Sequence, residues 1–252
     1  DELFGGYNRY SRINTIYNFL KYLPSESSTV LELIKKTKLL SNKNWSTSKF
    51  LKLKNLIESK SSLDLYENYI RLFNDNSLLN DAYKIVPKNN FSKIKDLPVK
   101  NIVDLAMLHD TVNYLPEDIL TKVDRMAMRS SLETRIPLLD HRIVEYCWSL
   151  PQTLKSNGNN QKKLLSKLAY KYIPENLLRG KKKGFGMPIG KWIRGPLKEW
   201  AGDLLNQSLI KQDGILVYEN VNNLWEEHLT EKKDWSYKLW TILALQSWLH
   251  RE

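Results

Sequence analysis

The sequence predicts a mainly α-helical protein, and three observations support this fold class. Apolar residues recur three and four positions apart along most of the 252-residue chain, as they do on the buried face of an amphipathic helix. Prolines and short polar turns separate these segments, which is where helices end. Strict alternation of apolar and polar residues, the pattern of a half-buried strand, is not convincing anywhere, and neither is an internal repeat.

Helical patterns fill the first hundred residues. The first predicted helix begins near Tyr10 and ends before Pro24. Aromatic residues at helical spacing in this half belong far more often to a core than to a ligand-binding surface. Residues 88–92 predict a loop. The other helices expected here span 30–37, 50–57, 63–73 and 99–108.

The second half continues in the same way. Asp140 is well placed to cap a helix from His141 to Leu150, which Pro151 ends. Residues 155–160 predict a turn-rich loop, and Pro196 lies where the first turn of another helix is expected. The remaining predicted helices span 163–172, 221–229 and 235–249, the last of them apolar on most sides.

Length and composition set limits on the function. The chain could form one large domain or two small ones, and its 42% of apolar residues is ample for a core. The formal net charge of +11 suits nucleic acid, an anionic membrane surface or a phosphate-bearing ligand. The lysines are spread along the chain rather than gathered in one stripe, so nucleic acid is not expected as a partner.

The single cysteine, Cys147, excludes a disulfide within the chain and favours a reducing, cytoplasmic compartment. It lies in a segment that predicts a packed helix, without the cationic neighbour that would activate a thiol, so we do not expect it to be a nucleophile. No apolar run is long enough to cross a bilayer, and the acidic start is unlike a signal peptide. Membrane is therefore not expected as a partner.

Residues 1–7 read DELFGGY and place two carboxylates just before a glycine pair. This arrangement lets the backbone approach a ligand while an acidic oxygen reaches a hard cation. The alternative is a frayed terminus with a turn, which residue types alone do not exclude.

The stretch 122–142 mixes charged and apolar residues more densely than any other. Buried charges are costly unless they are paired, so either ion pairs fix a helix against its neighbours, or the charges form an anion-binding or catalytic site. In a regular helix, Arg125, Arg129 and Glu133 would share one face, and Glu133 could neutralise Arg129.

Two other segments carry candidate groups. His109 and Asp110 could form an acid–base pair, but neighbours in a helix point in different directions, and we expect a capping or core-edge role. Lys181, Lys182 and Lys183 precede a Gly-Phe-Gly sequence, so a basic side chain is offered from a loop flanked by glycine. Such a loop can close over an anionic group, or it can simply be solvated.

Three groups of motifs resemble, in order, the synthetase domain of glutamine-hydrolysing asparagine synthetases. They are DELFGGY at 1–7, then LPEDIL at 115–120 with KVDR at 122–125 and SLETRIPLLDHR at 131–142, and finally KKGFGMPIGKW at 182–192. The resemblance implies the helical C-terminal portion of an α/β adenine-nucleotide α-hydrolase-like (PP-loop ATPase) domain. Residues 1–252 would then be a C-terminal fragment that lacks the N-terminal glutaminase domain and the PP-loop.

The resemblance also implies an activity for the parent protein. ATP would adenylate the side-chain carboxylate of aspartate, and ammonia from glutamine would displace AMP to give asparagine, with Mg²⁺ as the metal. Asp1 falls on a magnesium-holding aspartate, and Lys182 on a lysine that contacts pyrophosphate and the intermediate. Lys122, Glu133 and Arg135 would belong to the wall behind the reacting groups. The glycines expected beside the ATP pyrophosphate are Gly5 and Gly6.

Several expectations stay open at this point. The fragment alone should be inactive, its main expected partner is the missing N-terminal part of its own chain, and a homodimer is left open. Family relatives amidate a sugar acid, as in polysaccharide biosynthesis, or close a lactam ring, so the acceptor need not be aspartate. A basic all-helical module that binds nucleic acid is the alternative from another class.

Overall fold

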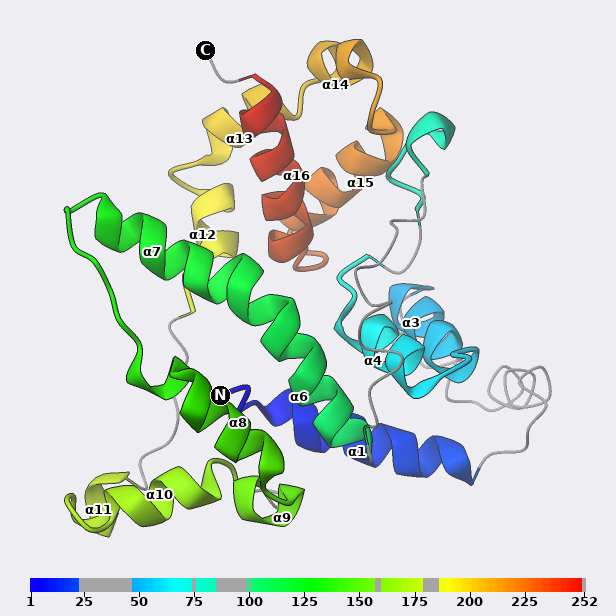
Figure 1. The fold of residues 1–252 in the computed structure, drawn as a ribbon. Helices are drawn as coiled ribbons and strands as arrows, with labels where there is room; N and C mark the ends of the chain where they lie inside the picture. Colours follow the sequence, from blue (N-terminus) through cyan, green and yellow to red (C-terminus); the bar gives the residue numbers. More distant parts are fainter. Residues whose placement is uncertain are drawn as a thin grey trace. The chain divides into compact units, whose positions relative to one another are not determined.

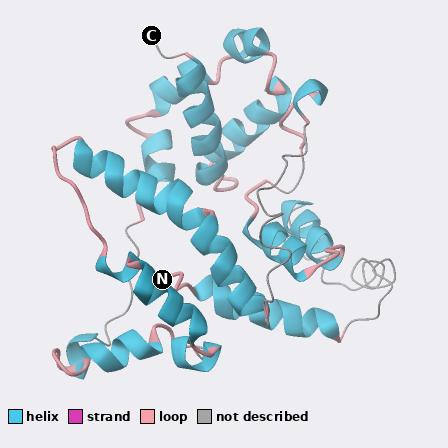
Figure 2. Cartoon of the chain, viewed as in Figure 1, coloured by secondary structure: helices cyan, strands magenta, loops and turns pink. Residues whose placement is uncertain are grey.

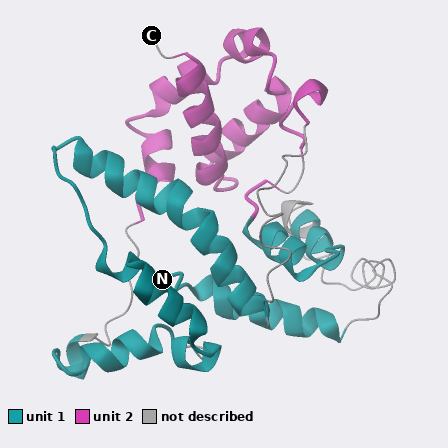
Figure 3. Cartoon of the chain, in the orientation of Figure 1, with its two compact units in different colours: residues 1–70, 89–181 teal, residues 71–88, 182–252 magenta. Residues whose placement is uncertain are grey.

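The computed structural model describes residues 1–22, 47–73, 76–84, 99, 101–156, 160–178 and 186–250. Within these residues the chain is mainly helical and contains no strand, as predicted (Figure 2). It divides into two compact units (Figure 3). Unit 1 comprises residues 1–70 and 89–181, and unit 2 comprises residues 71–88 and 182–252.

Unit 1 contains most of the helices of the first 181 residues (Figure 1). They are α1 (Asn8–Lys21), α3 (Thr47–Ile57), α4 (Ser62–Ile70), α6 (Ile102–Val112), the π-helical segment η2 (Leu115–Leu120), α7 (Thr121–Met128), the 3₁₀ turn η3 (Pro137–Leu139), α8 (His141–Ser149), α9 (Gln152–Lys155), α10 (Lys163–Ala169) and α11 (Glu175–Leu178). The predicted helix at 30–37 and the predicted loop at 88–92 lie outside the described residues.

The first core cluster of unit 1 joins α1, α3, α4 and α6. Of the apolar positions of α1 that predicted a helix, Ile13 is fully buried here, and Ile16, Tyr17 and Leu20 are partly buried against the same cluster. Helices with one apolar face are stabilised chiefly by this kind of packing. The buried members are Tyr10, Ile13, Leu56, Leu65, Tyr66, Ile102, Ala106 and Met107.

Helix α6 differs from the prediction at both ends. It begins at Ile102 because the Asn101 side chain accepts the backbone N–H groups of Val103 and Asp104 at 3.0 and 2.9 Å, which satisfies donors that a helix start leaves open. It continues to Val112, and Figure 1 shows it running on through η2 into α7. The prediction of a helix at 99–108 therefore placed it three to four residues too early.

Helix α8 confirms its predicted cap. The Asp140 carboxylate accepts the backbone N–H of Arg142 at 2.9 Å and the helix ends at Ser149, before Pro151. Its inner face forms a second cluster, in which Cys147 is buried with Leu3 and Phe4. The two apolar residues inside the acidic and glycine-rich motif therefore hold the start of the chain against α8.

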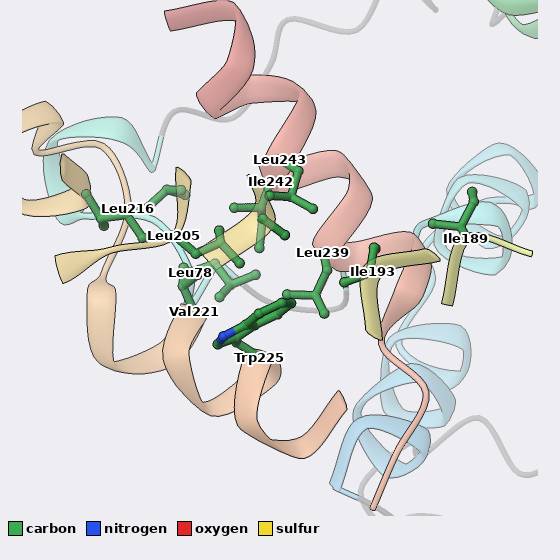
Figure 4. Packing of buried hydrophobic residues seen from close by; sticks show 12 residues of the cluster. Leu78, Ile189, Ile193, Leu205, Leu216, Val221, Trp225, Leu239, Ile242 and Leu243 are labelled. Carbon is green, nitrogen blue, oxygen red and sulfur yellow. The ribbon is translucent and has the colours of Figure 1, made fainter. Parts of the chain in front are cut away.

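Unit 2 is built around α16 (Ser236–Leu249), the predicted terminal helix. Trp225 of α15 packs with Leu239 and Leu243 of α16 in its core (Figure 4). The other elements are the 3₁₀ turn η1 (Asp81–Tyr83), α12 (Ile189–Arg194), α13 (Lys198–Leu204), α14 (Gln207–Asp213) and α15 (Tyr218–Leu229).

Some boundaries in both units were predicted wrongly. The helix expected to open at Pro196 begins at Lys198, after a turn. The helix expected at 163–172 ends at Ala169. Helices α12 and α14 were missed, although Asn206 caps α14 by accepting the backbone N–H of Leu209. No helix in the described part of the chain has the length and apolar character needed to cross a bilayer.

Candidate functional site

The predicted motif at the start of the chain forms a closed turn rather than a frayed end. Gly6 donates its backbone N–H to the Asp1 carbonyl oxygen at 2.8 Å. Leu3 and Phe4, 4% exposed each, anchor the turn in the core. Gly5 has a φ of 63°. Glycine adopts this left-handed conformation without the steric cost that residues with a Cβ would bear.

The Asp1 carboxylate is partly exposed and forms an ion pair with the Lys162 ammonium. Lys162 immediately precedes α10 (Lys163–Ala169). Its own φ of 52° and its backbone hydrogen bond to the Phe4 carbonyl oxygen, at 3.2 Å, hold it beside the turn at the start of α10. Sequence reasoning missed Lys162, because nothing local links it to residues so far away in the chain.

The second glycine of the turn, Gly6, lies where there is no room for a side chain. A Cβ built on Gly6 would lie 2.0 Å from Asp1 Oδ1 and 2.4 Å from Lys162 Cε. Both distances are far below van der Waals contact. A side chain at position 6 would therefore displace the Asp1–Lys162 pair.

The second carboxylate of the motif has a different environment from the first. Glu2 is only 5% exposed, and its Oε1 accepts the Tyr7 hydroxyl at 2.7 Å. A carboxylate that is buried and already hydrogen-bonded is not offered to a cation in solution. Of the two carboxylates, that of Asp1 is the more exposed, and it is ion-paired with Lys162.

The other predicted site residues form a separate, exposed group. Helix α7 ends at Met128, so Glu133 does not share a helical face with Arg129, and the predicted neutralisation of Arg129 by Glu133 is wrong. Glu133 instead pairs with Arg135 at 2.5 Å, and both side chains are mostly exposed. Lys122 pairs with Asp118 at 3.4 Å one turn earlier.

The stretch around Glu133 also exposes apolar groups. Within the described residues its charges are not buried against packed surface, contrary to the sequence interpretation. Exposed apolar side chains that gather in one segment are typical of surfaces that contact something else. They are Met126 (61%), Met128 (54%), Leu132 (62%), Ile136 (39%) and Leu138 (43%).

Lys182, the predicted pyrophosphate contact, lies outside the described residues. No group of three or more histidine, cysteine, aspartate or glutamate side chains in the described ranges could hold a metal by itself. Cys147 is buried, and burial raises the pKa of its thiol. The charge of Lys155 acts on this pKa in the opposite direction, so the expectation that the thiol has no cationic neighbour is wrong.

A polar pocket of about 660 Å³ opens next to the turn, within unit 1. Its lining includes Ser11 and Arg12 of α1 together with Gln152 and Ser156. Of the residues predicted from the sequence, Gly5 lines it, whereas Asp1 does not. The pocket is therefore a neighbour of the candidate metal residue and not its binding cavity.

Comparison with known proteins agrees with the motifs. The asparagine synthase family model matches residues 1–250. The chain is 30% identical to "Asparagine synthetase [glutamine-hydrolyzing] 1" of Bacillus subtilis over 259 residues, which are 98% of the chain and 38% of that protein. A putative asparagine synthetase of Mycobacterium tuberculosis is 35% identical over 55% of the chain and 21% of its own length.

A more distant relative carries another name. "Amidase chyE" of Penicillium rubens is 24% identical over 48% of the chain and 19% of its own length. No solved structure matches the chain. The sequence thus spans well under half the length of these curated relatives, and the family model matches nearly all of its residues. The chain belongs to the asparagine synthase family.

Proposed function

We propose that this chain is the C-terminal part of the ATP-dependent domain of a glutamine-hydrolysing asparagine synthetase. The observation that carries the proposal is the closed turn at residues 1–7, which holds one carboxylate towards solvent beside a lysine. The reaction would be amidation of aspartate with glutamine-derived ammonia through aspartyl-AMP, with release of pyrophosphate and AMP.

The residues of the turn fit Mg²⁺. This ion keeps several waters and is usually bound by one or two carboxylates together with substrate phosphates, rather than by a cage of protein ligands. Asp1 offers one such carboxylate, whereas Glu2 is held by Tyr7. When bound, Mg²⁺ would neutralise charge on the phosphate oxygens of ATP. Because Asp1 also pairs with Lys162, the metal would have to share the carboxylate with the lysine ammonium.

The other chain residues would serve binding and charge stabilisation. Lys182 would face the departing pyrophosphate, a role that rests on the family motif alone. Gly5 and Gly6 would let phosphate oxygens approach the backbone, because no side chain stands in the way. Glu133 and Arg135 form an exposed pair, which can turn towards a ligand without disturbing the core.

The main partner in this proposal is the remainder of the same protein, with its glutaminase domain and PP-loop. The exposed apolar side chains of the segment 126–138 support this view, because surfaces of this kind are commonly covered in the functional assembly. We place the PP-loop part of the domain against this segment.

The decisive experiment is product analysis with the full-length protein. It should be incubated with ATP, Mg²⁺, glutamine and aspartate, and the products identified by mass spectrometry. Asparagine, AMP and pyrophosphate in equal amounts are expected. Formation of none of the three products would contradict the proposal.

A second candidate keeps the scaffold and changes the acceptor. Relatives of this chain include a protein named as an amidase as well as proteins named asparagine synthetases, so the name of the reaction is not uniform among them. The acceptor would then be another carboxylate, such as a sugar acid. Screening candidate carboxylates for AMP release, in a reaction where aspartate gives no asparagine, would identify it.

A further inference from the structure

A buried charge pair lies directly behind the turn at residues 1–7. Asp110 of α6 is fully buried, and its Oδ2 lies 2.7 Å from Nη2 of Arg9. The same oxygen accepts the Tyr66 hydroxyl at 2.8 Å. A buried carboxylate is tolerated only when it is paired and hydrogen-bonded, so the position of Arg9 is tightly determined by α4 and α6.

Arg9 in turn fixes the ring of Tyr7. Its guanidinium carbon lies 4.3 Å from the centroid of the Tyr7 ring and 4.5 Å from that of Tyr114. The two rings meet edge to face at 5.9 Å. A cation placed between aromatic faces is attracted to both, so the Tyr7 ring is held between the core and the turn.

Tyr7 connects this arrangement to the motif. Its hydroxyl donates a hydrogen bond of 2.7 Å to Glu2, the neighbour of Asp1. Burial, with the hydrogen bond to Glu2 as a second cause, raises the pKa of the Tyr7 hydroxyl, which therefore remains a donor at neutral pH. Asp110, Arg9, Tyr7 and Glu2 thus form one continuous series of contacts from the core of unit 1 to the turn.

We infer that Arg9 and Tyr7 are positioning residues that hold the turn so that the Asp1 carboxylate keeps its place. The part of this inference that concerns the metal rests on the proposed function. The part that concerns the conformation of the turn rests on geometry alone. Without the Tyr7 hydroxyl, Glu2 would be left in the core lacking that donor. A buried acceptor without a donor is unfavourable, so the segment should open to let Glu2 reach water.

Two conservative variants provide a matched test. Tyr7→Phe and Tyr66→Phe each remove one hydroxyl that donates to a buried carboxylate, at 2.7 and 2.8 Å. Only the first hydroxyl reaches the turn. Substitution of Arg9 or Asp110 would leave a buried charge without its partner and endanger folding, and the two phenylalanine variants avoid this difficulty.

The first readout needs no ligand and no activity. Hydrogen–deuterium exchange of the full-length protein should show exchange of the Gly6 amide, which is bonded to the Asp1 carbonyl oxygen, roughly tenfold faster in Tyr7→Phe, the scale of one lost hydrogen bond to a charged group. In Tyr66→Phe, which leaves the Arg9–Asp110 pair in place, exchange of this amide should stay within about twofold of the unsubstituted protein. Equal exchange of this amide in the two variants would overturn the inference.

The second readout concerns the metal. In Tyr7→Phe the Mg²⁺ concentration giving half-maximal pyrophosphate release should rise by roughly tenfold, whereas in Tyr66→Phe it should stay within about twofold of the unsubstituted protein. An unchanged Mg²⁺ requirement in Tyr7→Phe would overturn the role towards the metal. If the unsubstituted full-length protein makes no asparagine, AMP or pyrophosphate, the proposed function fails, and the exchange contrast alone decides whether Tyr7 holds the turn.

Discussion

Replacement of Gly5 by alanine tests whether the turn at residues 1–7 is as constrained as its geometry indicates. The residue has a φ of 63°, where a side chain is disfavoured. In addition, a Cβ at this position would lie 2.6 Å from Ser156 Oγ and 2.8 Å from Ser156 Cβ. Backbone strain and steric overlap therefore act together.

The two contributions can be estimated separately. A left-handed conformation costs an alanine roughly 1–2 kcal/mol. Forcing an extra carbon into a packed site costs typically about 1–3 kcal/mol. Because Ser156 Cβ is next to the backbone and cannot rotate away, we expect Gly5→Ala to lower the free energy of unfolding of unit 1 by roughly 2–5 kcal/mol.

Gly214 supplies the control. Its φ of 67° is nearly the same, but no atom of the described residues lies within 4 Å of a Cβ built on it. Gly214→Ala should therefore show only the backbone contribution, roughly 1–2 kcal/mol. Urea unfolding of the chain, followed by circular dichroism, gives both values. If the two substitutions destabilise the chain equally, the close approach of Ser156 to Gly5 is not a real constraint.

Three further predictions concern single side chains. In the full-length protein, Lys182→Ala should reduce pyrophosphate release by roughly 100-fold, as expected for loss of a preorganised charge. Lys181→Ala and Lys183→Ala should have much smaller effects. Equally small losses for all three variants would mean that the three lysines belong only to a solvated loop. His228 is fully buried, and burial lowers its pKa from 6.5. The unfolded chain therefore binds more protons at acidic pH, and the free energy of unfolding should fall as the pH drops below about 6.5, by up to about 1.4 kcal/mol per pH unit. Urea unfolding at several pH values should show this slope, and His228→Gln should reduce it. Gln246 is 1% exposed, and among the residues that the structure describes neither of its side-chain polar atoms has a hydrogen-bond partner. Gln246→Met should therefore stabilise unit 2 by about 1 kcal/mol, and a lower melting temperature would contradict this.

Local signals in the sequence predicted much of the helical fold. The Asp140 cap, the apolar positions of α1 and the stop at Pro151 are all encoded within one or two turns of the helix they define. For α6 the decisive signal was the cap at Asn101, which was overlooked because the apolar pattern begins earlier. The predicted helix boundaries were therefore wrong where the capping residue and the apolar periodicity indicate different ends.

The site was predictable only in part, because its geometry depends on distant residues. The motif indicated Asp1 and the two glycines, but not Lys162 or the burial of Glu2. His109 and Asp110 are core residues rather than the capping or core-edge groups expected from the sequence, and His109 Nδ1 lies 3.6 Å from Asp110 Oδ1 although the two side chains were expected to point apart. Their burial beside Arg9 results from the packing of α1 against α6, which no local pattern specifies.

The position of Cys147 makes it possible to follow the two units separately. This lone thiol is 1% exposed in unit 1, so a thiol reagent can reach it only after that unit opens. Six of the eight tryptophans, Trp192, Trp200, Trp225, Trp235, Trp240 and Trp248, belong to unit 2, so intrinsic fluorescence mainly reports on that unit. Labelling and emission recorded together along a denaturant gradient would show, without any added probe site, whether the halves unfold in one step or two.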